Sequence, residues 1–175
     1  MDSSEFLGFL TSRSSVRDYI PETIANEEIT YILACASTAP SAGNLEAWDV
    51  VLVTDEDARL ELKEAAFEQE HIGQAAIILV VCANYVRSMS RYGERGILYA
   101  VQDATIAGTY MMLAAHAKNL HSCWTGAFDE GEVRSILGLP QHIRPVLLLA
   151  VGKGRPPCSL TERVAVADHV HYEQW

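Results

Sequence analysis

The stretch Ala76-Ile-Ile-Leu-Val-Val-Cys-Ala83 lies near the middle of the chain and carries no charged or hydrogen-bonding polar side chain. A continuous apolar run of this length is typical of a strand that is buried on both faces. Such a strand belongs to a central sheet that helices cover. The stretch therefore predicts a layered fold with this strand near its middle.

Helical and strand patterns alternate on both sides of this strand. Helices are expected over a short segment carrying Phe6 to Leu10 and over 26–39, 56–68, 98–118 and 130–137, and further strands over 49–54, 122–125 and 146–151. Asn26 is the expected N-cap of its helix, with Glu27 and Glu28 in the first turn, where the helix dipole favours negative charge. The alternation indicates an α+β or α/β class.

Length and charge limit the class of protein. The chain has 175 residues, of which 49% are hydrophobic and 21% charged, so one domain over residues 1–175 is expected. Its formal net charge of -10 argues against binding nucleic acid, which needs a basic surface.

The sequence also predicts where in the cell the protein is found. No apolar run reaches the roughly 20 residues that span a bilayer, so no membrane association is expected. The start, Met1 to Glu5, lacks the features of a signal peptide. The four cysteines, Cys35, Cys82, Cys123 and Cys158, are widely spaced, which favours reduced thiols. We expect a cytoplasmic protein.

Two guanidinium groups flank two hydroxyl groups in Arg13-Ser14-Ser15-Val16-Arg17. Arginine offers a planar fork of donors that fits a phosphate, and serine adds short hydrogen bonds. The segment predicts an anion site, although a solvated turn after a helix has the same composition.

Small and polar residues gather in two further segments. Pro40-Ser41-Ala42-Gly43-Asn44 separates a helix from a strand, and Ser122-Cys123-Trp124-Thr125-Gly126 ends another strand. Both can bring backbone close to a ligand, and both are also compatible with ordinary turns. His169 and His171 have the spacing of some metal sites, but no third ligand accompanies them, so no metal is expected.

Taken in order, these segments resemble the nitroreductase family of FMN-dependent oxidoreductases. The resemblance rests on four stretches, namely Arg13–Arg17, Pro40–Trp48, Asn119–Gly126, and the apolar strand Val146–Gly152 with the basic residues that follow it. The family pattern reads Gln-Pro before the tryptophan of the second stretch, whereas this chain has Glu46-Ala47. The resemblance implies an α+β fold with a central mixed sheet covered by helices.

The resemblance also implies roles for individual residues. The FMN phosphate would be held by Arg13, Ser14, Ser15 and Arg17, with Arg163 or Arg155 closing from the tail. The flavin would be lined by Pro40, Ser41 and Asn44. The flavin N5 and O4 edge would face the backbone of Thr125 and Gly126. Gln69 or His71 would reach its pyrimidine edge, although His71 is equally compatible with a surface loop.

The implied function is transfer of hydride from NADH or NADPH, through FMN, to an electrophilic acceptor by a ping-pong mechanism. Nitroaromatics, quinones and free flavins are the acceptors expected, and no protein nucleophile is needed. Two alternatives remain open: a protein that binds FMN without turnover, and a reductive dehalogenase or flavin-processing relative on the same fold.

The resemblance further implies an intertwined homodimer with the flavin at the subunit interface. In that arrangement the tail, about 156–175, would pack on the partner through Tyr172 and Trp175. The segment from Tyr85 to Gly96 carries three arginines. It is expected to form a mobile lid that receives an anionic substrate or the NADPH phosphate, or else an exposed basic loop.

Overall fold

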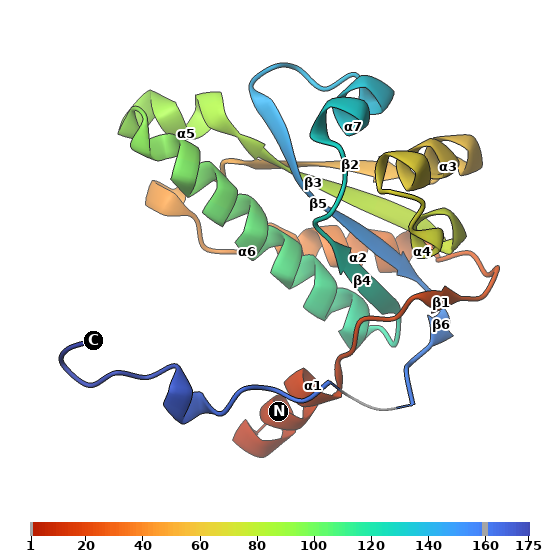
Figure 1. The fold of residues 1–175 in the computed structure, drawn as a ribbon, viewed down its shortest axis with the longest axis horizontal. Helices are drawn as coiled ribbons and strands as arrows, with labels where there is room; N and C mark the ends of the chain where they lie inside the picture. The colour runs from red at the N-terminus through yellow and green to blue at the C-terminus, as the bar shows by residue number, and fades with distance from the viewer. Residues whose placement is uncertain (1, 159–160) are drawn as a thin grey trace.

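The computed structural model describes residues 2–158 and 161–175. Its centre is a four-stranded sheet in the order β2-β3-β5-β4, formed by β2 (Trp48–Val53), β3 (Ile77–Asn84), β5 (Ile143–Gly152) and β4 (His121–Thr125). Neighbouring strands of this sheet run antiparallel, and a parallel bridge joins Ser15 to Ser122 beside β4. Figure 1 shows helices on both faces, so the predicted α+β class is confirmed.

Strand β3 is buried along its whole length, as its apolar run predicts. Successive side chains of a strand point to opposite faces. The odd-numbered residues of β3 join a core that includes α2 (Asn26–Ala36) and α6 (Arg95–Ala117). The even-numbered residues join a second core that includes α3 (Glu56–Ala65), α4 (Glu70–Gln74) and α7 (Glu130–Leu137). The sheet is therefore the middle of three layers.

Helix α6 is the longest element, with 23 residues. At a rise of about 1.5 Å per residue it is long enough to cross the whole sheet. Gly108 makes its close approach possible, because a Cβ atom there would lie 2.6 Å from the Leu147 side chain of β5. The prediction placed the start of this helix at Leu98, three residues after its actual start.

The ends of α2 differ from the prediction. The N-cap is Ala25 rather than Asn26, and the Glu28 carboxylate accepts a hydrogen bond from the Ala25 N–H at 3.0 Å. The helix ends at Ala36 instead of Ala39. The prediction of an acidic first turn is confirmed. The N-cap lies one residue earlier than predicted because Asn26 already has helical geometry.

The helix predicted over 56–68 is shorter in the structure, and a second helix, α4, begins at Glu70 just beyond the predicted range. Helix α3 ends at Ala65, and Phe67 and Glu68 adopt positive φ angles of 57° and 59°. Such angles reverse the chain and end a right-handed helix. Lys63 then forms ion pairs with Glu68 and Glu70, at 3.4 Å and 2.8 Å, that span the turn into α4.

The segment from Tyr85 onward is helical, so the prediction of a basic loop there is wrong. Helix α5 (Tyr85–Tyr92) follows β3 directly, and the Asn84 side chain caps it by accepting a hydrogen bond from the Arg87 N–H at 3.0 Å. Asn is a typical N-cap residue, so Asn84 was the available sequence signal for this helix.

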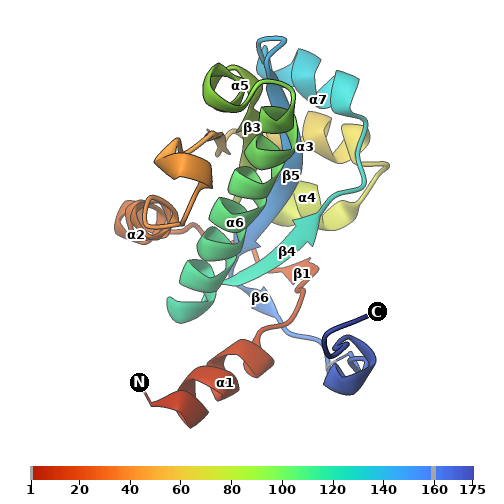
Figure 2. The same cartoon turned by 90° about the vertical axis from the view of Figure 1, so that its left-hand side faces the viewer.

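The two ends of the chain lie outside the layered body. Strand β1 (Asp18–Tyr19) pairs with β6 (Gly154–Arg155). Figure 2 shows α1 (Ser3–Ser12) and the C-terminal segment with its short 3-10 helix η2 (Val166–Asp168) extending away from the sheet. No residue of α1 is buried. All four cysteines are unpaired thiols, and no helix in the described chain has the length and apolar character needed to cross a bilayer.

Candidate functional site

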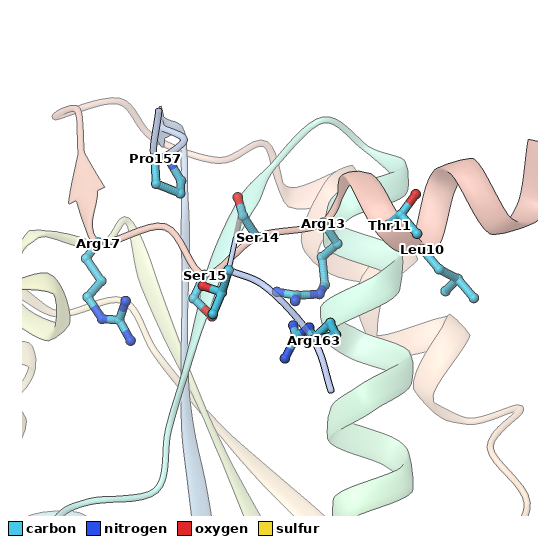
Figure 3. Close-up of a pocket in the computed structure, with 9 residues that line it drawn as sticks. Leu10, Thr11, Arg13, Ser14, Ser15, Arg17, Pro157 and Arg163 are labelled. Carbon is cyan, nitrogen blue, oxygen red and sulfur yellow. The ribbon is translucent and has the colours of Figure 1, made fainter. Parts of the chain in front are cut away.

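A cavity of about 590 Å³ opens beside the segment from Arg13 to Arg17. Its walls come from both ends of the chain and consist of Leu10, Thr11, Arg13, Ser14, Ser15, Arg17, Pro157, Thr161 and Arg163. Figure 3 shows the Arg13, Arg17 and Arg163 side chains projecting to the same side of this segment. The cavity thus gathers three cations and several hydroxyl groups.

Val16 fixes this segment to the body of the protein. Its side chain is buried, and its N–H donates a hydrogen bond to the Ser122 carbonyl at 3.0 Å. In extended backbone, alternate side chains face opposite ways. Burying Val16 therefore turns Ser15 and Arg17 away from the core and toward the cavity.

The three arginines of the cavity have no carboxylate partner in the part of the chain that the structure describes. Within residues 2–158 and 161–175, none of Arg13, Arg17 and Arg163 makes a hydrogen bond or an ion pair. Three guanidinium groups without carboxylate partners are unusual in a chain of net charge -10. Guanidinium and hydroxyl donors together match a phosphate oxyanion, so the cavity can hold a dianion.

The other tail arginine lies elsewhere. Arg155 forms an ion pair with Asp18 at 3.3 Å, across the short β1–β6 ladder, and does not line the cavity. Of the two tail arginines named from the sequence, Arg163 is therefore the one placed to meet an anion beside Arg13.

His71 and Thr125 form a buried pair behind this cavity. The Nε2 atom of His71 lies 2.7 Å from the Thr125 hydroxyl oxygen, and both residues are buried. Burial, and secondarily the positive charge of Arg17, lower the pKa of His71 and favour the neutral imidazole. The alternative of a surface-loop His71 is wrong, because helix α4 carries the residue into the interior.

Gln69 holds the chain that follows Thr125. Its Nε2 atom donates to the Ala66 carbonyl at 2.8 Å and to the Ala127 carbonyl at 2.9 Å. Gly126, between the buried Thr125 and this anchored carbonyl, is exposed. The two amide hydrogens of Gln69 therefore brace the loop, while Gly126 leaves its backbone accessible.

Cys123 and Tyr19 complete the interior around this strand end. Burial raises the pKa of the Cys123 thiol, and burial raises the pKa of Tyr19. The Tyr19 hydroxyl donates to the Ala150 carbonyl at 3.1 Å. Both groups thus stay neutral, and neither supplies a reactive anion.

A second cavity, of about 470 Å³, lies beside the Pro40–Asn44 segment. It is lined by Pro40, Ser41, Ala42, Tyr99, Val101, Gln102, Asp103, Thr105 and Ile106. The two cavities share no lining residue. Asn44 is exposed at a φ of 57° and lines neither of them. Within one chain, the structure therefore does not bring Pro40, Ser41 and Asn44 together with the arginine cavity.

Asp103, which sequence reasoning missed, and Arg87, one of the arginines expected in a lid, hold the chain between Ala42 and Trp48. Asp103, buried in α6, accepts hydrogen bonds from the N–H groups of Ala42 and Ala47 at 2.9 Å and 3.1 Å. Arg87 of α5 donates to the Glu46 and Trp48 carbonyls, the latter at 3.0 Å. A lone carboxylate in the apolar helix predicted for 98–118 was the available signal for Asp103.

Helix α5 is therefore held by several side-chain contacts, and the mobile lid expected there stays a prediction. Arg87 also forms an ion pair with Asp49 at 3.0 Å. Arg91 lies over the Tyr92 ring at 5.5 Å and donates to the Gly43 carbonyl at 3.3 Å. These contacts hold α5 against the chain around the Pro40–Asn44 segment, so Arg87 and Arg91 have a structural role.

Comparison with known proteins gives a consistent result. A family model described as the nitroreductase family matches residues 10–74 and 66–153. An NADH dehydrogenase of Thermus thermophilus is 30% identical over 80% of this chain and 82% of its own length. An FMN reductase [NAD(P)H] of Bacillus subtilis is 28% identical over 85% of this chain and 66% of its own length. The structure of nitroreductase A from Vibrio parahaemolyticus superposes with a TM-score of 0.90, at 25% identity, over 100% of this chain and 77% of that chain.

Proposed function

The chain belongs to the nitroreductase family, and from this membership we propose that it is an oxidoreductase that binds FMN and passes electrons from NADH or NADPH to a small electrophilic acceptor. Relatives named as FMN reductases and NAD(P)H nitroreductases support the cofactor and the reductant. The acceptors proposed are nitroaromatics, quinones or free flavins.

The observation that carries the proposal is the arginine cavity. Arg13, Arg17 and Arg163 have no carboxylate partner in the described chain, and Ser14 and Ser15 line the same space. A charge-assisted hydrogen bond contributes roughly 1.5–3 kcal/mol, so this donor set fits the dianionic phosphate of FMN. We assign the phosphate to these residues, with Arg163 rather than Arg155 closing from the tail.

The flavin ring requires a second copy of the chain in this proposal. Pro40, Ser41 and Asn44 lie apart from the arginine cavity within one chain, which supports their supply by a partner. Exposed apolar groups on α1 and the tail support the same arrangement, since Leu7 is 62% exposed and Tyr172 is 86% exposed. We propose a homodimer in which the tail wraps the partner.

When bound, FMN supplies two-electron redox chemistry. The chain contributes position and electrostatics. The arginines would neutralise the phosphate, and the exposed backbone at Gly126 would offer an N–H to the flavin ring. His71, held neutral by burial, orients the Thr125 that precedes this N–H. Reductant and acceptor occupy the same space in turn, which is a ping-pong order.

A titration with FMN followed by NADH tests the proposal. The purified protein is expected to bind FMN, to lose the visible absorbance of the bound flavin within seconds of NADH or NADPH addition, and to recover it with a nitroaromatic or a quinone. Binding without bleaching would establish an FMN-binding protein without turnover. Failure to bind FMN would refute the cofactor assignment.

A further inference from the structure

We propose that Asp103 is a positioning residue that holds the Ser41–Ala47 loop in the strained shape needed to present Ser41 and Asn44 to the flavin. The inference rests on the proposed function, because it assigns a purpose to a loop that the FMN assignment uses. It concerns a side chain on α6 that contributes nothing to the arginine cavity.

The two oxygens of the Asp103 carboxylate hold the two ends of this loop. Oδ1 accepts the Ala42 N–H at 2.9 Å, and Oδ2 accepts the Ala47 N–H at 3.1 Å. Asp103 is only 2% exposed and forms no ion pair within the described residues. A buried carboxylate without a cation is costly, and backbone N–H donors are what make it tolerable. The same two bonds satisfy the N–H groups of Ala42 and Ala47, so the burial of the carboxylate and the shape of the loop depend on each other.

The loop is strained between these two anchors. Gly43, Asn44 and Glu46 adopt φ angles of 59°, 57° and 48°. Positive φ is unfavourable for residues other than glycine, and it persists only where surrounding contacts impose it. At Gly43 a Cβ atom would also overlap the Tyr92 hydroxyl, so a larger residue there would require the Tyr92 side chain to move. All three of these residues lie between Ala42 and Ala47, the two residues whose N–H groups Asp103 holds.

The shape fixes Ser41 in one orientation. The Ser41 Oγ atom accepts the Glu46 N–H at 2.9 Å, which leaves its hydroxyl hydrogen free to donate outward. Arg87 donates a hydrogen bond to the Glu46 carbonyl of the same loop. Without Asp103 the loop would relax its positive φ angles, and Ser41 and Asn44 would lose their fixed direction.

Asp103→Asn tests this role because it keeps the size of the side chain but removes one of the two acceptors. Asp55→Asn is the matched control, since the Asp55 carboxylate accepts the Ala58 N–H at 2.9 Å at the start of α3, on the other face of the sheet. Thermal unfolding, the Kd for FMN and steady-state kinetics at saturating FMN are measured for both variants and for the wild type. A double-mutant cycle with Ser41→Ala completes the set.

Asp103→Asn is expected to raise the Kd for FMN about tenfold or more, and to lower kcat at saturating FMN with little change in the KM for NADH. Asp55→Asn is expected to leave both values unchanged. Ser41→Ala is expected to weaken FMN binding less in the Asp103→Asn background than in the wild type, because the loop is already released.

The inference is overturned if both Asn variants bind FMN and turn over like the wild type. It is also overturned if Asp103→Asn lowers the melting temperature while the FMN-loaded variant keeps the wild-type kcat, since that result would indicate a purely structural role. A wild type that does not bind FMN would instead refute the proposed function.

Discussion

The Nε2 atom of His71 and the hydroxyl oxygen of Thr125 lie 2.7 Å apart in the protein interior and join helix α4 to the end of strand β4. The two residues are 54 positions apart in the chain. Their contact links the second core of the sheet to the exposed backbone of Gly126. Burial keeps the imidazole neutral, so the pair is a pH-sensitive point in the fold.

Burial lowers the pKa of His71 below its ordinary value of 6.5, so the unfolded chain takes up a proton more readily than the folded one. The stability from this residue is complete above pH 6.5 and is lost as the pH falls toward the lowered value. His71→Gln removes this titration. The difference in free energy of unfolding between wild type and variant is expected to shrink by up to about 1.4 kcal/mol per pH unit below that point.

Urea unfolding of both proteins from about pH 8 to about pH 5 measures that difference. A smaller acid slope persists in the variant, because burial, and secondarily His116, also lower the pKa of His121. A difference that does not change with pH would contradict the assignment of a neutral, buried His71.

Leu79→Ala tests the burial of the central strand. Leu79 is 0% exposed in the core shared by β3 and α6, so its truncation is expected to cost about 2–5 kcal/mol of unfolding free energy. Leu52→Ala, at a side chain of β2 that is 40% exposed, is the control and is expected to cost less than about 1 kcal/mol. Equal losses at the two positions, measured by chemical unfolding, would contradict the layered packing.

Arg17→Ala tests the phosphate assignment. Arg17 lines the cavity and has no protein partner among the described residues, so its removal is expected to raise the Kd for FMN about tenfold to a hundredfold without changing the melting temperature of the apoprotein. Arg155→Ala removes the same charge from an ion pair with Asp18 outside the cavity, and is expected to raise the Kd less than about threefold. Fluorescence of FMN on titration measures both. An unchanged Kd in Arg17→Ala would remove the assignment.

Deletion of residues 164–175 tests the proposed dimer. Five large apolar or aromatic side chains of this segment are exposed, namely Val164, Val166, Val170, Tyr172 and Trp175. The truncated chain keeps Arg163, so the arginine cavity retains its three cations. We expect light scattering to show a dimer for the full chain and a shift toward monomer for the truncated one. A monomeric full chain would refute the arrangement.

The layered fold was predictable because its signals are local. The apolar run of β3 showed that both of its faces are buried, and the periodicity of α6 showed a long helix packed on the sheet. The boundaries were less accurate. Lys63 of α3 forms ion pairs with Glu68 in the turn and Glu70 after it, and propensity alone does not reveal such contacts.

The arginine cavity was only half predictable. Arg13 and Arg17 are two of five consecutive residues and were visible as a motif. The choice between Arg155 and Arg163 depended on the β1–β6 pairing, which places Arg155 opposite Asp18. Residues more than a hundred positions apart, such as Arg13 and Arg163, line the same cavity, and no local sequence pattern specifies a contact of this kind.

The sequence by itself determined a layered fold of helices on a central sheet, the arginine and serine motif at residues 13–17 and the family resemblance, because hydrophobic periodicity and short motifs are properties of neighbouring residues. Only the tertiary structure decided that Asp103 closes the Ser41–Ala47 loop, that α5 is anchored by Arg87, and that the two cavities are separate within one chain. A buried charged group needs hydrogen-bond partners because water is excluded from it. Only the fold decides which distant backbone groups come within reach.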